Sequence, residues 1–167
     1  ISERKQAERY QHLSAEILGI LNDPLSLPDA IEQILAAIKQ ETNFSAVGIR
    51  LESGEGFPYF TQTGFSDDFL MTENNLIALD KEGGICLDEN GKPKLECTCG
   101  MILSGCFDAS NPMCTASGSF WTNDAANLLE IPPERDSRLH PRNRCIHEGY
   151  SSVALIPIRA NRRIIGL

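Results

Sequence analysis

Hydrophobic positions follow a helical period over the first part of the chain. Between residues 3 and 22, apolar side chains recur at steps of three and four among charged ones, which predicts a helix with a narrow apolar stripe. The stripe is formed by Ala7, Tyr10, Leu13, Ile17 and Ile20. It fits either packing of the helix on its own domain or a parallel coiled-coil seam between two copies of the chain. A second helix is predicted from an N-cap at Ser26 to Thr42–Asn43, with Pro28 and Asp29 in its first turn.

The period changes to two after residue 44. "SAVGIRLE" alternates apolar and polar positions, and "FPYFTQTGF" is rich in aromatic residues and Thr, so these segments predict a hairpin joined by "SGEG". Residues 66–94 are weakly patterned, apart from a short helix that Ser66 could cap. At the end of the chain, "SSVALIPIR" and "RIIGL" flank the polar "ANRR" and predict a second hairpin. This order of elements predicts an α+β fold, with a central antiparallel sheet and helices packed on one face.

Composition and charge restrict the classes of protein that the chain can belong to. Its 167 residues suit one domain with a hydrophobic core, and its net charge of −8 argues against nucleic acid as a partner. We expect no membrane contact by this domain, because no apolar run approaches the roughly 18–20 residues that span a bilayer. Six cysteines are too few for a disulfide scaffold, so we expect a cytoplasmic protein. The missing initial Met and the apolar ending "RRIIGL" predict a fragment of a longer chain.

Three segments carry a resemblance to a known family. "LECTCGMILSG", "GSFWTN" and "RNRCIHEGYSSVALIPI" resemble a cysteine-containing subgroup of GAF domains, the signal-input modules of multidomain PAS/GAF sensor histidine kinases. The resemblance implies a six-stranded antiparallel sheet, with the irregular segment 85–148 over a ligand pocket. It also implies an N-terminal linker or dimerisation helix over residues 1–23 and a GAF sensor domain over 24–167. The last strand and a C-terminal helix would then be truncated.

The cysteines are the first candidate for chemistry. Within the recurring segments of the resemblance, Cys97 and Cys99 form a C-x-C pair and Cys145 follows far along the chain. Three thiolates suit a zinc or iron–sulfur centre, and the hypothesis is that these three converge. The fourth ligand would be Cys114, His147, water or an exogenous group. A redox-responsive thiol or disulfide pair and inert buried thiols are the alternatives.

Haem is a further alternative for the cofactor, whose identity the sequence leaves open. His140 and His147 flank Cys145, and either His could be an axial ligand. Against haem, "HPRN" is typical of a turn or of the start of a helix.

An aromatic segment is the second candidate. In "GSFWTND", Phe120 and Trp121 could form a wall of a small-molecule site, and Asn123 with its neighbour Thr122 could supply hydrogen bonds. Tyr150 could line the same cavity. The alternative is that Trp121 only fills the core.

The segment "RDSRLHPRNR" is locally basic within an acidic protein. It contains Arg138, Arg142 and Arg144, and Arg144 is a further candidate for the ligand site. The three arginines either attract an anionic ligand or form a solvated face paired with Asp and Glu.

These features predict a non-catalytic sensor domain of a signalling protein. It would bind a small ligand or a Cys-ligated metal or redox centre, and it would form a homodimer through the N-terminal helix. The first alternative is a GAF-fold thiol enzyme of the free methionine sulfoxide reductase type, which uses a nucleophilic thiolate and a resolving Cys. The second is a dimerisation module with a degenerate pocket. No kinase chemistry is expected, because the chain has no glycine-rich ATP lid and His140 lacks the helical setting of a phospho-acceptor.

Overall fold

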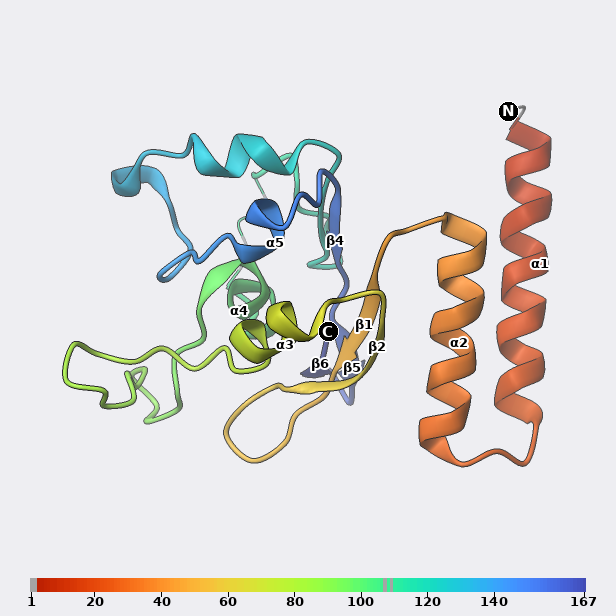
Figure 1. Cartoon of the computed structure of the whole chain (residues 1–167), viewed down its shortest axis with the longest axis horizontal. Helices are drawn as coiled ribbons and strands as arrows, with labels where there is room; N and C mark the ends of the chain where they lie inside the picture. The colour runs from red at the N-terminus through yellow and green to blue at the C-terminus, as the bar shows by residue number, and fades with distance from the viewer. Residues whose placement is uncertain (1–2, 107, 109) are drawn as a thin grey trace. The chain divides into compact units, whose positions relative to one another are not determined.

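The computed structural model of the chain describes residues 3–106, 108 and 110–167, and its fold is α+β (Figure 1). The first two residues of the predicted linker, and residues 107 and 109 of the predicted irregular segment, lie outside this part. The α-helices are α1 Glu3–Asn22, α2 Leu27–Thr42, α3 Asp67–Glu73, α4 Cys97–Leu103 and α5 Arg144–His147. The strands are β1 Val47–Arg50, β2 Tyr59–Thr63, β3 Phe120–Thr122, β4 Val153–Leu155, β5 Ile158–Ala160 and β6 Arg163–Gly166. Two 3₁₀ helices, η1 Ala125–Leu129 and η2 Pro133–Arg135, follow β3.

The described residues form two compact units. Unit 1 comprises those up to residue 49 together with 59–66, and unit 2 comprises 50–58 together with 67–167. The two parts of unit 1 and of unit 2 are therefore interleaved along the chain. All the cysteines and all the other predicted site residues belong to unit 2.

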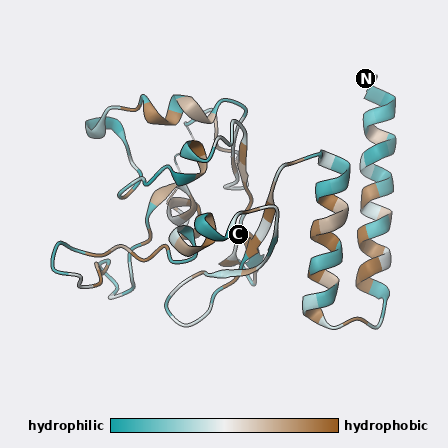
Figure 2. Ribbon diagram, in the orientation of Figure 1, coloured by the Kyte–Doolittle hydropathy of each residue, from teal (hydrophilic) through white to brown (hydrophobic). Residues whose placement is uncertain are grey.

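In unit 1, α1 packs against α2. The positions Leu13, Ile17 and Ile20 of the predicted stripe are half-buried, which confirms that this helix packs within its own chain. Tyr10 and Leu18 of α1 stay exposed, and Figure 2 shows that hydrophobic residues are concentrated toward the C-terminal end of this helix.

Local signals set the ends of α2 where the sequence predicts them. The Ser26 Oγ accepts the backbone N–H of Asp29 at 3.4 Å, so Ser26 is the N-cap. The helix ends at Thr42, where Asn43 adopts the left-handed conformation (φ 57°) and donates its N–H to the Lys39 carbonyl.

Both predicted hairpins are present. β1 pairs with β2, and Gly48 fits there because a Cβ at this position would lie 2.9 Å from the Tyr59 ring. β5 pairs antiparallel with β6 around Asn161 and Arg162, whose positive φ values (49° and 67°) are those of a two-residue hairpin turn. The predicted strand "SSVALIPIR" is divided before Pro157, and its first half, β4, pairs with β3 instead.

The strands do not form the single central sheet that the sequence predicts. In the described part they form three two-stranded sheets, β1–β2, β3–β4 and β5–β6. Backbone bonds also join Arg50 to Leu167, at 2.8 and 2.9 Å in the two directions, and Glu52 to Ile165 at 2.9 Å. The named strands are only three to five residues long. Each therefore has few backbone N–H and C=O groups that could pair with a third strand.

The core of unit 2 is built on α4. One cluster contains Met101, Ile102 and Phe120, and α4 extends into a second cluster through Leu103. The sequence predicts an irregular segment here, and the structure corrects this prediction. Six of the seven residues of "CTCGMIL" are buried, so the helix has no polar face and shows no amphipathic period. None of the helices in the described part of the chain combines the length and apolarity needed to cross a membrane.

Candidate functional site

Cys97, at the start of α4, holds the segment that leads to α5. Its backbone adopts a left-handed conformation (φ 62°), and its N–H donates to the Leu139 carbonyl at 2.8 Å. Its Sγ accepts the backbone N–H of Arg142 at 2.8 Å and lies 3.9 Å from the His140 carbonyl oxygen. Residues 139–142 therefore lie against the beginning of α4, and Cys145 follows three residues later.

The thiols of Cys97, Cys99 and Cys145 lie close enough to influence one another electrostatically. Burial raises the pKa of Cys99 to about 12, and the neighbouring Cys145 and Cys97 raise it further while Arg50 opposes the shift. Burial also raises the pKa of Cys145, with Cys97 as the next cause. Cys97, Cys99 and Cys145 are named the thiol cluster below, because Cys97 contributes to the raised pKa of both other thiols. The sequence predicts this grouping.

The thiol cluster contains no disulfide, since all six cysteines of the chain are free thiols. It is also not closed around a metal ion. Among the residues that the structure describes, no group of three or more His, Cys, Asp or Glu side chains is arranged to hold one. The described side chains therefore do not have the arrangement of a metal centre.

Two other candidates for the fourth ligand lie differently. Cys114 packs against the core cluster around Phe120, and burial together with Asp108 raises its pKa. The described neighbours of Cys114 therefore differ from those of the thiol cluster. His147, on α5, is exposed.

A buried carboxylate that the sequence does not single out lies beside the thiol cluster. Glu73 ends α3, and its side chain is only 8% exposed. Desolvation raises its pKa, opposed by Arg142 and Arg50. Glu73 in turn contributes to the raised pKa values of Cys99 and Cys145. The only sequence signal is its position four residues after the buried Phe69, on the same face of α3.

Two arginines hold the C-terminal end of α3. Arg142 donates to the carbonyls of Thr72 and Asn75, at 2.9 Å each. Arg50 donates to the carbonyl of Asn74 at 3.3 Å and to that of Glu73. The end of a helix carries partial negative charge, which both guanidinium groups offset. Arg142 thus connects Cys97, through its backbone N–H, to the end of α3, through its side chain.

The ion pairs around Glu73 leave polar atoms unsatisfied. The Nε of Arg142 lies 3.5 Å from Glu73 Oε1 and 3.3 Å from Glu96 Oε2. Both Arg142 Nε and Glu73 Oε1 are buried and have no hydrogen-bond partner among the described residues, and the same is true of Arg144 Nε. An unsatisfied buried polar group costs about 1–3 kcal/mol, so these atoms are the strained part of the site.

The predicted aromatic wall does not lie on one surface. Phe120 is buried in the core at 1% exposure, whereas Trp121, which could instead have filled the core, is 50% exposed. The two side chains point to opposite faces because they are consecutive in β3. Asn123 is exposed, and the Tyr150 ring packs edge-on against Phe69 with 6.1 Å between centroids. Phe120 and Trp121 therefore do not form one wall, because one is buried and the other is exposed.

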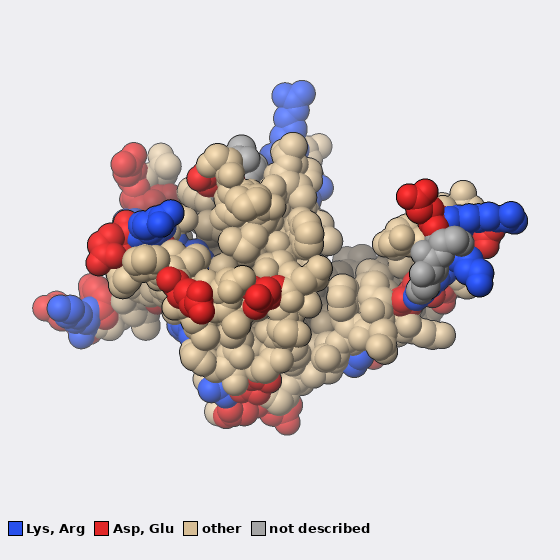
Figure 3. Space-filling view, turned by 90° about the horizontal axis from the view of Figure 1, so that it is seen from above, with Lys and Arg blue, Asp and Glu red and all other residues tan. Residues whose placement is uncertain are grey.

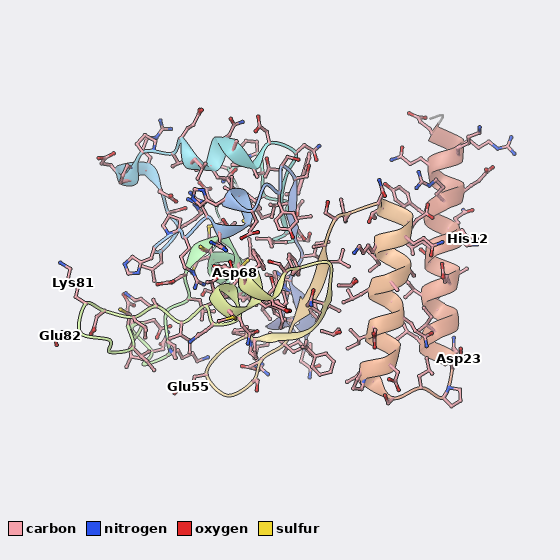
Figure 4. All side chains as sticks on the ribbon, viewed as in Figure 1. His12, Asp23, Glu55, Asp68, Lys81 and Glu82 are labelled. Carbon is pink, nitrogen blue, oxygen red and sulfur yellow. The ribbon has the colours of Figure 1, made fainter. Side chains whose placement is uncertain are left out.

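The basic segment is paired with acidic side chains. Arg144 interacts with Asp68, which Figure 4 shows on α3, and lies 2.6 Å from Glu148. Arg138 pairs with Asp136 and is buried, so the expected solvated face is wrong for this residue. Among the described residues seen in Figure 3, acidic and basic side chains lie near one another in several places. Each of the three arginines therefore has an acidic partner, but the face is not a solvated one at Arg138.

Comparison with known proteins gives no further guide. No family model, no curated protein and no solved structure matches this chain.

Proposed function

We propose that the chain is a GAF-type signal-input domain of a cytoplasmic signalling protein such as a sensor histidine kinase. The thiol cluster of Cys97, Cys99 and Cys145 is its sensing element. The observation that carries the proposal is the grouping of three free thiols from segments more than forty residues apart in the sequence. The segments that contain these cysteines are also those that resemble the GAF subgroup.

The state of the thiols favours sensing over catalysis. A thiol enzyme of the methionine sulfoxide reductase type needs a thiolate nucleophile. Burial raises the pKa of Cys99 to about 12 and also raises that of Cys145, so both are protonated at neutral pH. Turnover of free methionine sulfoxide with dithiothreitol, abolished by one Cys→Ser change, would instead support the enzyme.

The contacts of Cys97 supply a route by which a change at sulfur reaches α3. A ligand or covalent group on this sulfur competes with the N–H of Arg142, which bonds to it at 2.8 Å. Movement of Arg142 changes the bonds from its guanidinium to Thr72 and Asn75. Occupied and unoccupied clusters would then favour different packings of the end of α3.

The proposal is tested by hydrogen exchange on the whole chain. The thiols are alkylated with iodoacetamide under mild denaturation, and the protein is then refolded. Amide hydrogen exchange is followed over α3 and residues 74–76. We expect faster exchange there when Cys97 is alkylated. A Cys106→Ser variant is the matched control, because Cys106 is exposed and outside the cluster. Unchanged exchange over α3 in a folded, Cys97-alkylated protein would contradict the proposal.

A further inference from the structure

We propose that Cys97 is an oxidation site, at which hydrogen peroxide causes its sulfur to become bonded to the backbone nitrogen of Arg142. The proposal rests on the proposed function, because it names the stimulus that the sensing element detects. The observation that carries it is a contact between two atoms 45 positions apart in the sequence, Cys97 Sγ and the Arg142 backbone nitrogen, at 2.8 Å. An oxidised cysteine can condense with a backbone nitrogen to form a sulfenamide.

Three contacts fix the sulfur of Cys97 against the segment before α5. The Cys97 N–H donates to the Leu139 carbonyl at 2.8 Å, and its thiol donates to the His140 carbonyl at 3.9 Å. The Arg142 N–H donates to the sulfur from the same segment. Pro141 restricts the backbone just before this N–H. The sulfur and the nitrogen are therefore in contact before any oxidation.

Arg142 is also held through its side chain. Its guanidinium donates to the carbonyls of Thr72 and Asn75, at 2.9 Å each. The position of its backbone nitrogen thus does not depend on the sulfur alone. Reacting groups held about 3–3.5 Å apart react far faster than the same groups free in solution, and the distance here is within that range.

The modification takes place in two steps. In the first, the Cys97 thiol attacks one oxygen of hydrogen peroxide, the O–O bond breaks, and sulfenic acid and water form; sulfur loses two electrons and the peroxide gains them. In the second, the Arg142 nitrogen bonds to sulfur and the S–O bond breaks. The hydroxyl leaves with the amide proton as a second molecule of water. The linked protein has lost two hydrogen atoms in total.

The nearby cysteines are poorly prepared to react with the sulfenic acid instead. A disulfide forms when a second thiolate attacks the oxidised sulfur. Burial raises the pKa of Cys99 to about 12 and also raises that of Cys145, so both remain protonated at neutral pH. The Arg142 nitrogen already contacts the sulfur and requires no second thiolate.

The link is a reversible change of state. It replaces a hydrogen bond between α4 and the segment before α5 by a covalent bond, and it prevents further oxidation to the irreversible sulfinic acid. A reducing thiol attacks the sulfur, returns the proton to the amide nitrogen and forms a mixed disulfide. A second thiol then releases Cys97. Linked and unlinked chains are two distinguishable states, as a sensor requires.

Peptide mapping of the oxidised whole chain tests the proposal. The reduced, folded protein is treated with equimolar hydrogen peroxide, then denatured and alkylated with iodoacetamide, and its proteolytic peptides are sequenced by mass spectrometry. We expect the peptide containing Cys97 to be joined to the one containing Arg142, at a mass lower by two hydrogen atoms than their sum. Cys99 and Cys145 should be alkylated in the same product. Dithiothreitol added before alkylation should abolish the link.

The exposed Cys106 provides the matched comparison. Its Sγ lies 3.6 Å from the Ser104 carbonyl oxygen, a group that cannot displace hydroxide from sulfur. Cys106→Ser should form the link as the unchanged protein does, whereas Cys97→Ser should form none. Dimedone, which traps sulfenic acid, should label Cys97 at the expense of the link. The map of the unchanged protein decides the question even if Cys97→Ser fails to fold.

Three results would overturn the proposal. They are a disulfide from Cys97 to another cysteine, oxidation of Cys97 to sulfinic acid without the link, and a Cys97 that stays unmodified in the folded chain. If no link forms but alkylation of Cys97 still accelerates exchange over α3, the oxidation site fails and the proposed sensing function stands. If the link forms and exchange over α3 is unchanged by alkylation, the reverse holds.

Discussion

Arg138 is buried because its guanidinium has a partner in each direction. It donates to both carboxylate oxygens of Asp136, at 2.8 and 2.7 Å, to the Leu128 carbonyl at 2.8 Å and to the Asn143 side chain at 2.9 Å. These bonds connect η1, η2 and the residue before α5. A charged side chain is stable inside a protein only with such compensation, so this pair fixes the segment that leads to α5 and Cys145.

The first prediction concerns the acid stability of this pair. Hydrogen bonds from Arg138 lower the pKa of Asp136 below its ordinary value. The stability that this carboxylate contributes is therefore fully present above its unfolded pKa of about 3.9, and is lost as the pH falls through the lower folded value. Asp136→Asn should reduce the free energy of unfolding by about 1–3 kcal/mol at pH 7. It should also flatten the loss of stability between about pH 5 and 2.

Urea unfolding at a series of pH values measures both effects. Asp124→Asn is the control, because Asp124 is exposed and forms no ion pair among the described residues. Parallel stability–pH curves for Asp136→Asn and the unchanged protein would contradict the prediction.

At the scale of elements, two helical glycines have opposite surroundings. A Cβ at Gly100 in α4 would lie 2.4 Å from the backbone carbon of Leu95, whereas a Cβ at Gly19 in α1 would have nothing within 4 Å. Helix propensity alone favours Ala over Gly by about 1 kcal/mol at both positions. The close backbone contact decides the sign at Gly100, because α4 is buried among its neighbours and cannot move outward.

We therefore predict opposite effects of the same substitution. Gly100→Ala should destabilise the chain by about 1–3 kcal/mol, as overpacking of a core does. Gly19→Ala should stabilise it by about 0.5–1 kcal/mol. Chemical denaturation of both variants measures the free energy of unfolding, and stabilisation by Gly100→Ala would show that α4 is less tightly packed than described.

Three apolar residues of α1 stay exposed, and they are where the predicted homodimer would form. Leu18 and Leu21 are each 59% exposed, as is Tyr10, although the half-buried stripe of this helix faces α2. Exposed apolar residues that lie together on a protein surface often mark a site where another protein chain binds.

The third prediction is that these leucines hold a dimer. The double change Leu18→Glu and Leu21→Glu should raise the dimer dissociation constant by at least about tenfold, because it places like charges at the centre of the contact. Sedimentation velocity at several concentrations measures it. Met71→Glu is the control, since Met71 is 84% exposed on α3. A chain that is monomeric before mutation would contradict the prediction.

The elements that the sequence predicts well are those decided by neighbouring residues. Ser26 and Asn43 mark the ends of α2, and the turn at Asn161 follows from local backbone preference. The helix α4 could not be predicted, because a helix buried on all sides has no amphipathic period. The pairing of β4 with β3 depends on residues more than thirty positions apart.

The residues of the candidate site also differ in how far the sequence alone predicts them. The resemblance to a family groups Cys97, Cys99 and Cys145, and in the structure Cys97 contributes to the raised pKa of the other two thiols. Glu73 was missed because its importance comes from burial and from the arginines around it, which a single sequence does not display. Similarly, "FW" indicates two aromatic residues but not that the strand directs only Phe120 into the core.

At the scale of the whole molecule, the interleaving of the two units decides how the chain can be divided. Residues 50–58 run from the last residue of β1 to the residue before β2, and they belong to unit 2. There, Arg50 and Glu52 bond to Leu167 and Ile165, and the Arg50 side chain donates to carbonyls at the end of α3. Unit 2 is therefore not a continuous piece of the chain.

The last prediction follows from this interleaving. A fragment of residues 67–167 contains the thiol cluster and Glu73 but lacks Arg50, so the end of α3 loses one of its two guanidinium partners and Ile165 and Leu167 lose their strand neighbour. We expect this fragment to show no cooperative unfolding transition by circular dichroism, whereas a fragment of residues 44–167, which retains 50–58, should unfold cooperatively. The full chain with Arg50→Met tests the side chain separately, and should lose about 1–3 kcal/mol because buried carbonyls at the end of α3 then lose their donor. Cooperative unfolding of 67–167 at the midpoint of 44–167 would mean that residues 50–58 contribute nothing to unit 2. It would also mean that the bonds from Arg50 to the end of α3 do not stabilise the helix that positions Glu73.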